Sequence, residues 1–394
     1  MTKRHDPRHT ASQSTPAFAA PATGSLPAKG LHVHDGMPRL DPAPRYPWFK
    51  RNLSDPFFYL VPGLMWLALA LRHGSLSLPS AANPGMEAGG LWGESKSQGL
   101  ELFGPGGQRH LAAYVRLERG NDSGEAASGR ALAAMAVAGL AFPVVGKPDR
   151  GYQGWGVRKL MDDRDLRDYL IPARPELTLL LQKLIDWQGE AGIFYIRHPD
   201  EAQGRIASFA LNYAPHVVGD GQGRVADLVR ADPVLRQNAE IYRARNRGRW
   251  QAVPDKGEVV ILTNARSARL GAVYRDAAHM VTPELEACID NIAREIPGFH
   301  FGRFDIRFRS IGALLQGRDF CIVELNGAGA EMLHLWDGRK STLEAYRTLW
   351  GQYRALFSIG AEMRRQGHHP TGLRELLRLQ RRQEKLRRSY PPTS

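Results

Sequence analysis

The chain has 394 residues, 43% of them hydrophobic, and this length suits a globular protein of two or three subdomains. Its two cysteines exclude a disulfide framework and a cysteine-based metal cluster, and they indicate a reducing compartment, which we expect to be the cytoplasm. Of the net charge of +13, residues 1–51 carry +5 and residues 361–394 carry +6, so the body is nearly neutral and we do not expect nucleic acid as a partner.

The first 45 residues are rich in Ala, Pro, Ser and Thr, and we expect them to be a disordered tail. They contain no apolar stretch of the kind that a signal peptide has. Residues 46–94 are expected to form a reduced N-terminal domain that contains one apolar helix.

Residues 57–71 are an apolar run without charge inside that region. The run is shorter than the roughly 20 residues that span a bilayer, and Pro62 interrupts it. Lys50 and Arg51 precede it and Arg72 follows it. Two interpretations stay open: a buried helix, or a helix in the membrane interface whose flanking cations meet the headgroups on the inner face of the membrane.

A lysine and three glycines suggest a phosphate site further along the chain. Lys147 stands at the exit of a short strand, and Gly151, Gly154 and Gly156 follow before a helix expected over 162–170. Glycines allow backbone amides to point at phosphate oxygens, and lysine supplies a charge for them. The alternative is a plain turn between hairpin strands, because the lysine precedes the glycines, unlike in the P-loop.

The next strand carries residues that suit an adenine ring. An apolar run over 177–185 ends in Gln182, Lys183 and Ile185, and Glu190 follows five residues later. A strand edge with an apolar wall can hold adenine, and a nearby carboxylate can accept hydrogen bonds from ribose hydroxyls. The alternative for each residue is a solvated polar group at a strand end.

A polar loop precedes a strand expected over 272–274. Asn264, Arg266 and Arg269 lie in this loop and could hold an anionic group of a substrate. Glu331, which comes shortly after two glycines, could position or deprotonate an amine, as could His334. For the last two residues a structural role is the alternative.

Two β-rich segments, 302–307 and 322–327, carry the metal candidates. If they pair as neighbours, Asp305, Glu324 and Asn326 converge on one face. Such oxygen ligands suit Mg²⁺, which takes one or two carboxylates and completes its octahedron with water and phosphates. Arg303 points to the same face as Asp305 and could meet a substrate, or it could simply pair with that carboxylate.

Helices are expected over 126–139, 283–296, 341–364 and 373–388, and together with the strands they predict an α+β fold with antiparallel sheet. The last helix has leucines surrounded by arginines. It could lie on the body with a basic face toward an acidic partner, a membrane surface or RNA, or it could present an ordinary solvated face.

The order of these motifs resembles the ATP-grasp superfamily, in particular the carboxylate–amine ligases such as D-alanine–D-alanine ligase. The resemblance covers roughly residues 95–340, and residues 216–221 and 262–266 are similar to the cyanophycin synthetase branch. It implies two α+β subdomains that grip ATP, an ATP-binding one over 95–215 and a metal-bearing one over 216–345. Residues 346–394 would then be C-terminal helices with a basic tail.

The resemblance implies a role for each candidate. Lys147 would contact the α and β phosphates, with Lys96, 51 residues earlier, as a second phosphate lysine, and the glycine loop would close as a lid. Gln182, Lys183 and Ile185 would border the adenine, and Glu190 would hold the ribose. Asp305, Glu324 and Asn326 would bind magnesium ions, two of them in the family, with Mn²⁺ as an alternative. Arg303 would face the acyl phosphate, and the loop residues would contact substrate.

The implied activity is an ATP-dependent ligase that joins a carboxylate to an amine, both small molecules. Two alternatives stay open: a kinase that phosphorylates a hydroxyl, and a nucleotide-binding protein without catalysis that acts at a membrane surface. The sequence departs from the family at Asn212 and Tyr213, where a basic residue is common; Arg205 is the nearest cation before them, and Arg303 and Arg307 could compensate. An oligomer is also compatible with the sequence.

Overall fold

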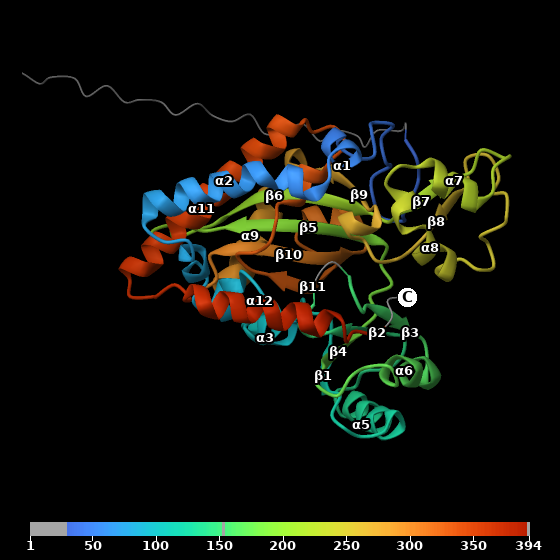
Figure 1. Ribbon diagram of the computed structural model, residues 1–394, viewed down its shortest axis with the longest axis horizontal. Coiled ribbons are helices and arrows are strands. Elements are labelled where there is room, and N and C mark those ends of the chain that lie inside the picture. Colours follow the sequence, from blue (N-terminus) through green and yellow to red (C-terminus); the bar gives the residue numbers. More distant parts are fainter. Residues whose placement is uncertain (1–29, 152–153, 392–394) are drawn as a thin grey trace, which may run out of the picture.

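The computed structural model describes residues 30–151 and 154–391, which form an α+β structure with three antiparallel sheets (Figure 1). The expected fold class is thereby confirmed. The largest sheet has the order β11-β10-β5-β6-β9, and its strands are β5 (Gly189–Ile196), β6 (Arg205–Tyr213), β9 (Val273–Asp276), β10 (Phe301–Phe308) and β11 (Phe320–Asn326).

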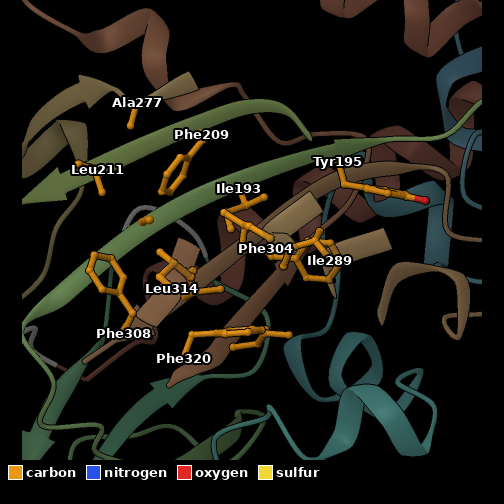
Figure 2. Packing of buried hydrophobic residues seen from close by; sticks show 14 of the residues in the cluster. Ile193, Tyr195, Phe209, Leu211, Ala277, Ile289, Phe304, Phe308, Leu314 and Phe320 are labelled. Carbon is orange, nitrogen blue, oxygen red and sulfur yellow. The ribbon is translucent and has the colours of Figure 1, made fainter. Parts of the chain in front are cut away.

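The two faces of this sheet have different roles because successive strand residues point to opposite sides. Ile193 on β5, Phe209 on β6 and Phe304 on β10 face the helix α9 (Pro283–Arg294), where Ile289 packs against them (Figure 2). The short helix α10 (Ile311–Leu315) adds Leu314 to this cluster. The residues between these apolar ones along each strand therefore point to the other side of the sheet. On β10 they include the charged side chains of the candidate site.

A second sheet forms a smaller lobe with the order β1-β4-β2-β3. Its strands are β1 (Tyr114–Glu118), β2 (Val144–Pro148), β3 (Arg158–Leu160) and β4 (Thr178–Lys183), and it packs against α5 (Gly124–Val137) and α6 (Asp163–Leu170). Residues 184–188 connect this lobe to the large sheet. The boundary expected at residue 215 is therefore wrong, because β6 pairs with β9 and β5 pairs with β10 in one continuous sheet.

A third, small unit lies at one end of the large sheet (Figure 1). It contains β7 (His216–Val218), β8 (Val259–Ile261), α7 (Val225–Ala231) and α8 (Ala239–Arg245), and it has its own apolar cluster.

Two long helices lie side by side over the second face of the large sheet, α2 (Asp55–His73) and α11 (Thr342–Arg365) (Figure 1). The expected apolar helix over 57–71 is thus present, and Pro62 lies within it. The shorter helices α1 (Trp48–Asn52), α3 (Lys96–Glu101) and α4 (Pro105–Gln108) complete the N-terminal part. No helix within the described ranges is long and apolar enough to cross a membrane.

The C-terminal helix α12 (Leu373–Arg387) bridges the large body and the small lobe. Leu376 is buried in the cluster beneath α11, whereas Leu386 and Tyr390 pack against the cluster of the small sheet. The helix therefore lies on the body, and whether its basic face meets a partner or only solvent stays a prediction.

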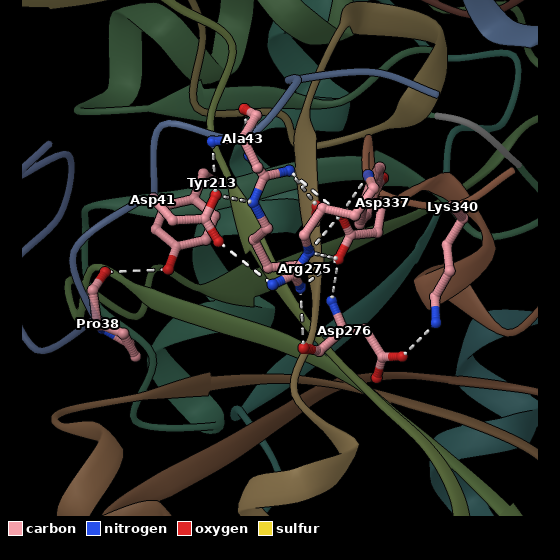
Figure 3. Close-up of polar contacts among 10 residues, drawn as sticks. Pro38, Asp41, Ala43, Tyr213, Arg275, Asp276, Asp337 and Lys340 are labelled. Carbon is pink, nitrogen blue, oxygen red and sulfur yellow. Dashed lines mark hydrogen bonds and ion pairs between the residues drawn. The ribbon is translucent and has the colours of Figure 1, made fainter. Parts of the chain in front are cut away.

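Residues 30–45 are packed against the body, which corrects the expectation that the whole stretch 1–45 is disordered; residues 1–29 lie outside the described residues. Val33, Met37 and Leu40 are buried in the main core. Asp41 accepts a hydrogen bond at 3.0 Å from Nε of the buried Arg275 (Figure 3). The expectation rested on the average composition of the stretch, whereas a few apolar and charged residues fix it to the body.

Asp337 connects that segment to the C-terminal part of the fold. Its carboxylate is completely buried, pairs with Arg275 at 3.5 Å and with Arg339, and accepts from the Asp276 backbone N–H at 2.8 Å (Figure 3). Burying a charge is favourable only when partners of opposite charge and hydrogen bonds compensate for lost hydration. Asp337 and Asp41 together therefore balance the charges of Arg275 and Arg339.

We expect Asp337→Asn to lower the free energy of unfolding by roughly 3–5 kcal/mol, because it removes the fully buried one of the two carboxylates that balance the buried Arg275 guanidinium. Urea-induced unfolding followed by circular dichroism measures the change. Asp227→Asn is the matched control, since Asp227 is exposed and pairs only with Arg230 one turn away on α7, and it should change stability by less than about 1 kcal/mol. Equal effects of the two variants would contradict the assignment.

Candidate functional site

A cleft of about 2090 Å³ lies where the large sheet, the small lobe, α2 and the loop 264–269 meet. Nearly all of the predicted site residues line it; Lys96, Gly156 and His334 do not. Those in its lining are Lys147, Gly151, Gly154, Gln182, Lys183, Ile185, Glu190, Asn264, Arg266, Arg269, Arg303, Asp305, Glu324, Asn326 and Glu331.

Strands β10 and β11 place four polar side chains on the cleft face. Arg303 pairs with Asn326 in the antiparallel register and Asp305 pairs with Glu324, so all four point the same way. Arg303 donates to both carboxylate oxygens of Asp305, at 2.6 Å and 3.0 Å, and Asn326 Nδ2 donates to Asp305 Oδ2 at 3.0 Å. The expected convergence is observed, and Arg303 forms the salt bridge that was the alternative to a substrate role for this residue.

The neighbouring strand makes room for this arrangement. Gly192 lies opposite Asp305 on β5, and a Cβ at this position would come within 3.1 Å of Arg303 Cδ and 2.7 Å of Leu333 Cδ1. A larger residue would therefore push the guanidinium away from Asp305.

Two buried lysines reach the same place from other elements. Lys96 is the first residue of α3, and its Nζ lies 3.1 Å from Glu324 Oε1. Lys147, on β2, donates from Nζ to the backbone carbonyl of Val323 at 3.1 Å and to Gln182 Oε1 at 2.8 Å. Both lysines therefore contact β11, Lys96 at Glu324 and Lys147 at the residue before it.

Asp149 holds the two lysine-bearing segments together. Its carboxylate accepts from Ser95 Oγ at 2.6 Å and from the Ser97 N–H at 2.8 Å, and its carbonyl accepts from the Lys96 N–H at 3.0 Å. Because Asp149 lies two residues after Lys147, the start of α3 is fixed to the end of β2. Sequence reasoning missed this residue, although an acid immediately after the lysine strand was a visible signal.

The charges in this cluster shift one another's protonation. Burial lowers the pKa of Lys147 to about 8, with Lys96 contributing repulsion, although Glu324 opposes the shift. Burial alone would raise the pKa of Glu324, but Lys96 and Lys147 outweigh it and lower that pKa. Burial raises the pKa of Asp305 in spite of Arg303. The cluster therefore holds several charges in little water, where each additional charge has a large effect.

The glycine loop borders the cleft on the side of the small lobe; residues 152–153 lie outside the described residues. Gly151 accepts from Lys96 Nζ through its carbonyl at 2.5 Å. Gly154 has a φ of +74°, a left-handed conformation that favours glycine. Trp155 lies against the guanidinium of Arg269, 4.2 Å from the ring centroid, so the loop touches the polar loop 264–269.

The adenine candidates lie at the junction of the two sheets. Gln182 and Lys183 end β4, and Ile185 follows in the connection to β5. Gln182 is buried and accepts a hydrogen bond from Lys147, whereas Lys183 is exposed. Ile185 is half-buried and lines the cleft, and its place beside an adenine ring stays a prediction.

Glu190 is held by two arginines. Its carboxylate lies 2.7 Å from Nη2 of Arg307 and 3.5 Å from Nε of Arg266, and Asn212 Nδ2 lies 3.4 Å from its other oxygen. Arg266 also donates to two backbone carbonyls, and burial lowers its pKa to about 10. Of the cations considered near Asn212, Arg205 is excluded because it lies exposed at the opposite end of β6 and does not line the cleft.

Arg266 and Arg307 are cations that lie beside Glu190, and Arg266 also donates to the Asn212 carbonyl. Both come from segments far away in sequence, a loop before β9 and the strand β10. Their approach to Glu190 could not be inferred from spacing, because it depends on the order in which the strands are placed in the sheet.

Glu331 and His334 have different surroundings. Tyr59, on α2, donates to Glu331 Oε1 at 2.8 Å, and Arg303 donates to the Glu331 carbonyl at 3.0 Å. Burial raises the pKa of Glu331. His334 instead contacts Ser208 Oγ at 2.7 Å and Thr348 Oγ1 at 3.3 Å, and it does not line the cleft, so the structural alternative describes it better.

Glu94 is a further cleft residue that sequence reasoning did not assign. Burial raises its pKa to about 7, and it accepts from the Gly327 N–H at 3.1 Å. The loop that carries it packs closely on the end of β11, because a Cβ on Gly90 would lie 2.7 Å from the Cα of Gly327. Gly90 also has a φ of +71°.

The donor set at Asp305, Glu324 and Asn326 fits magnesium in kind. Within the described ranges no group of three or more His, Cys, Asp or Glu residues could hold a metal ion. Two carboxylates and one amide oxygen nevertheless match what Mg²⁺ takes from a protein when phosphates supply further ligands. The Asn326 amide nitrogen is turned toward Asp305, which leaves its oxygen for another partner.

Neither a family model nor a curated protein matches the chain. Solved structures with which it shares likeness include a bifunctional glutathione synthetase from Pasteurella multocida, at 17% identity and a TM-score of 0.35 over 65% of this chain and 36% of that protein. Others are D-alanine–D-alanine ligase from Bacillus anthracis, at 11% and 0.39 over 72% of both chains, and VanG D-Ala:D-Ser ligase from Enterococcus faecalis, at 14% and 0.36 over 68% of this chain and 62% of that one. The chain thus spans about a third of the length of the glutathione synthetase. The function of the present chain has to be argued from its own residues.

We expect Gly90→Ala to destabilise the protein by about 2–4 kcal/mol, because it combines a left-handed backbone with a clash against Gly327. Gly74→Ala is the matched control, since Gly74 has a φ of +66° but nothing within 4 Å of an added Cβ, so only about 1 kcal/mol is expected. Thermal unfolding of both variants measures the difference. If the two lost the same stability, close packing of the 89–94 loop on β11 would be ruled out.

Proposed function

We propose that this protein is an ATP- and Mg²⁺-dependent ligase of the ATP-grasp type, which activates a carboxylate as an acyl phosphate and joins it to an amine. The observation that carries the proposal is that Lys96, Lys147 and Arg303 gather around Asp305 and Glu324 at the wall of the cleft. Phosphoryl transfer requires positioning and charge neutralisation more than covalent help from the protein. Cations and metal-binding carboxylates side by side provide both.

Asp305, Glu324 and Asn326 would hold the magnesium. Bound there, the ion would neutralise the charge of the phosphates and orient them for transfer. Lys96 and Arg303 balance the two carboxylates, so either cation can turn toward a nucleotide or an acyl phosphate when the carboxylates take up metal.

The nucleotide would lie between the two sheets. Lys147 and Lys96 would contact its phosphates, with amides of the glycine loop beside them. The connection 184–188, with Gln182, Lys183 and Ile185 at its start, would border the adenine. Glu190 would hold the ribose, which is compatible with its pairing to arginines because each carboxylate oxygen accepts more than one hydrogen bond.

The acceptor end would be built around Arg303. Its guanidinium can hold the carboxylate that becomes the acyl phosphate and then stabilise the negative charge of the tetrahedral intermediate. The carboxylate of Glu331 can bind the incoming ammonium group and take its proton. Asn264 and Arg266 would contact other polar groups of the substrate.

Purified protein with ATP, Mg²⁺ and pooled amino acids tests the reaction class. We expect release of ADP and phosphate only when both a carboxylate and an amine are present, because the amine must consume the acyl phosphate. Release that needs only a hydroxyl compound would point to a kinase. Nucleotide binding without any turnover in a wide panel would point to a protein without catalysis.

The double variant Asp305→Asn, Glu324→Gln should lose turnover by roughly 100-fold or more, because the metal and the cations around it would lose their anionic partners. Steady-state phosphate release at saturating ATP measures the loss. Asp227→Asn, Glu240→Gln serves as the control, since both carboxylates are exposed on α7 and α8. Unchanged turnover in the first variant would remove the metal assignment.

Arg303→Lys should reduce kcat by roughly 100-fold while the affinity for ATP stays within about threefold, because lysine keeps the charge but loses the two-pronged contact with a carboxylate. A comparison of kcat with ATP binding measured by calorimetry separates the two effects. A parallel loss of ATP affinity would instead place Arg303 at the nucleotide.

A further inference from the structure

The helix α2 exposes a continuous apolar stripe. Its members recur at intervals of three and four residues, so they form one face of the helix. The exposed fraction of each is high: Phe57 72%, Leu60 63%, Leu64 59%, Leu67 44% and Leu71 75%. The opposite face is buried against α11 and the loop after α2, through Phe58, Leu69 and Ala70. Five large apolar side chains on one exposed face are more than a single-chain surface ordinarily leaves uncovered.

The charges around the stripe have mainly one sign. Residues 56–71 carry no charge, and Arg72 follows them. The neighbouring helix α11 exposes arginines and only one acid; across the two helices the exposed charged residues are Arg72, Arg347, Arg354, Arg364 and Arg365 against Asp55 and Glu344. A second copy of the chain would bring two such basic surfaces together, whereas an anionic surface would complement them.

The stripe also borders the cleft. Gly63 lines the cleft and is exposed, and it lies three residues after Leu60 and four before Leu67, so it is their direct neighbour on the helix surface. Tyr59 and Trp66, also on α2, form part of the cleft wall. One helix therefore has a buried face, a face toward the cleft and an exposed apolar face.

We propose that α2 docks this protein on an anionic lipid surface, with its apolar stripe in the interface and the arginines of α2 and α11 at the headgroups. The apolar side chains supply the burial, and each arginine near the surface adds attraction to anionic lipid. The helix lies flat, since no helix in the described part of the chain can cross a bilayer.

Docking in this way places the mouth of the cleft beside the lipid. If the proposed ligase function holds, the substrate class that this geometry favours is a carboxylate or an amine carried on an amphiphile, whose polar end enters the cleft past Gly63 while its chain stays in the membrane. Tyr59 and Trp66 would line its path, and Glu331, which Tyr59 contacts, would meet the polar end.

Flotation of the full chain with vesicles tests the docking without any use of catalysis. We expect binding to vesicles in which about one third of the phospholipid is anionic, and weak binding to purely zwitterionic vesicles. Leu60→Glu, Leu64→Glu should weaken binding to the anionic vesicles at least about tenfold, because it replaces two inserting side chains by charges. These residues are exposed, so the fold should persist, as circular dichroism can verify.

Val137→Glu, Ile171→Glu is the matched control. Both residues are apolar and exposed, at 91% and 61%, but they lie on the small lobe away from α2, so vesicle binding should not change. The proposal would be overturned if the two double variants lost vesicle binding equally, or if the wild-type chain bound anionic and zwitterionic vesicles equally well. It would also be overturned if light scattering showed a stable dimer that Leu60→Glu, Leu64→Glu dissociates, since the stripe would then bind a second copy.

The substrate class has a separate readout. In the assay of phosphate release, acylated amines or carboxylates presented in anionic vesicles should be turned over faster than their soluble counterparts, and the difference should vanish in Leu60→Glu, Leu64→Glu. Turnover of soluble substrates alone, with vesicle binding intact, would leave the ligase in place and overturn the amphiphilic substrate. Failure of all turnover would count against the ligase and leave the docking result unaffected.

Discussion

The antiparallel pairing of β10 with β11 is the constraint on which the site depends. It sets Arg303 opposite Asn326 and Asp305 opposite Glu324, so that one guanidinium, two carboxylates and one amide share a face. Phe304 and Phe308, on the other face of β10, are buried in the main core and keep the strand from rotating. A slip of one residue would move the charges into that core, where they would lack partners, and the register is therefore strongly specified.

Around this pair the protein gathers charge from several elements and balances it locally. Lys96 comes from the start of α3 and Lys147 from the small lobe, and both meet Glu324 or its neighbour. Lys96 and Arg303 each have a carboxylate partner, and Lys147 donates to a side-chain amide oxygen and a backbone carbonyl; such partners are the condition under which burial of charge is tolerated. The same balance makes the cluster responsive, because a phosphate or a metal ion entering it would compete for those partners. Asp149 ties the two lysine segments together, so they would move as a unit.

The N-terminal part of the chain contributes to the main core and to the cleft. Residues 30–45 are fixed by Arg275 and by apolar contacts, and α2 closes one side of the cleft with Tyr59, which holds Glu331. The helix that carries the proposed lipid contact is thus also a wall of the proposed active site. Tyr59 on α2 donates to the Glu331 carboxylate, and Arg303 donates to the Glu331 carbonyl. Two residues therefore connect the proposed lipid-binding helix with the proposed catalytic arginine.

The sequence by itself determined the local features: the α+β class, the long helices, the glycine loop, and the two strand motifs whose side chains had to share a face if they paired. These follow from periodicity and from residue chemistry over short distances. Only the tertiary structure decided that the strands do pair, that β5 and β6 belong with β9 and β10, and that Arg266 and Arg307 meet at Glu190. It also decided that residues 30–45 are packed. Such outcomes depend on contacts between segments up to 298 residues apart, as between Asp41 and Arg339, which local patterns do not encode.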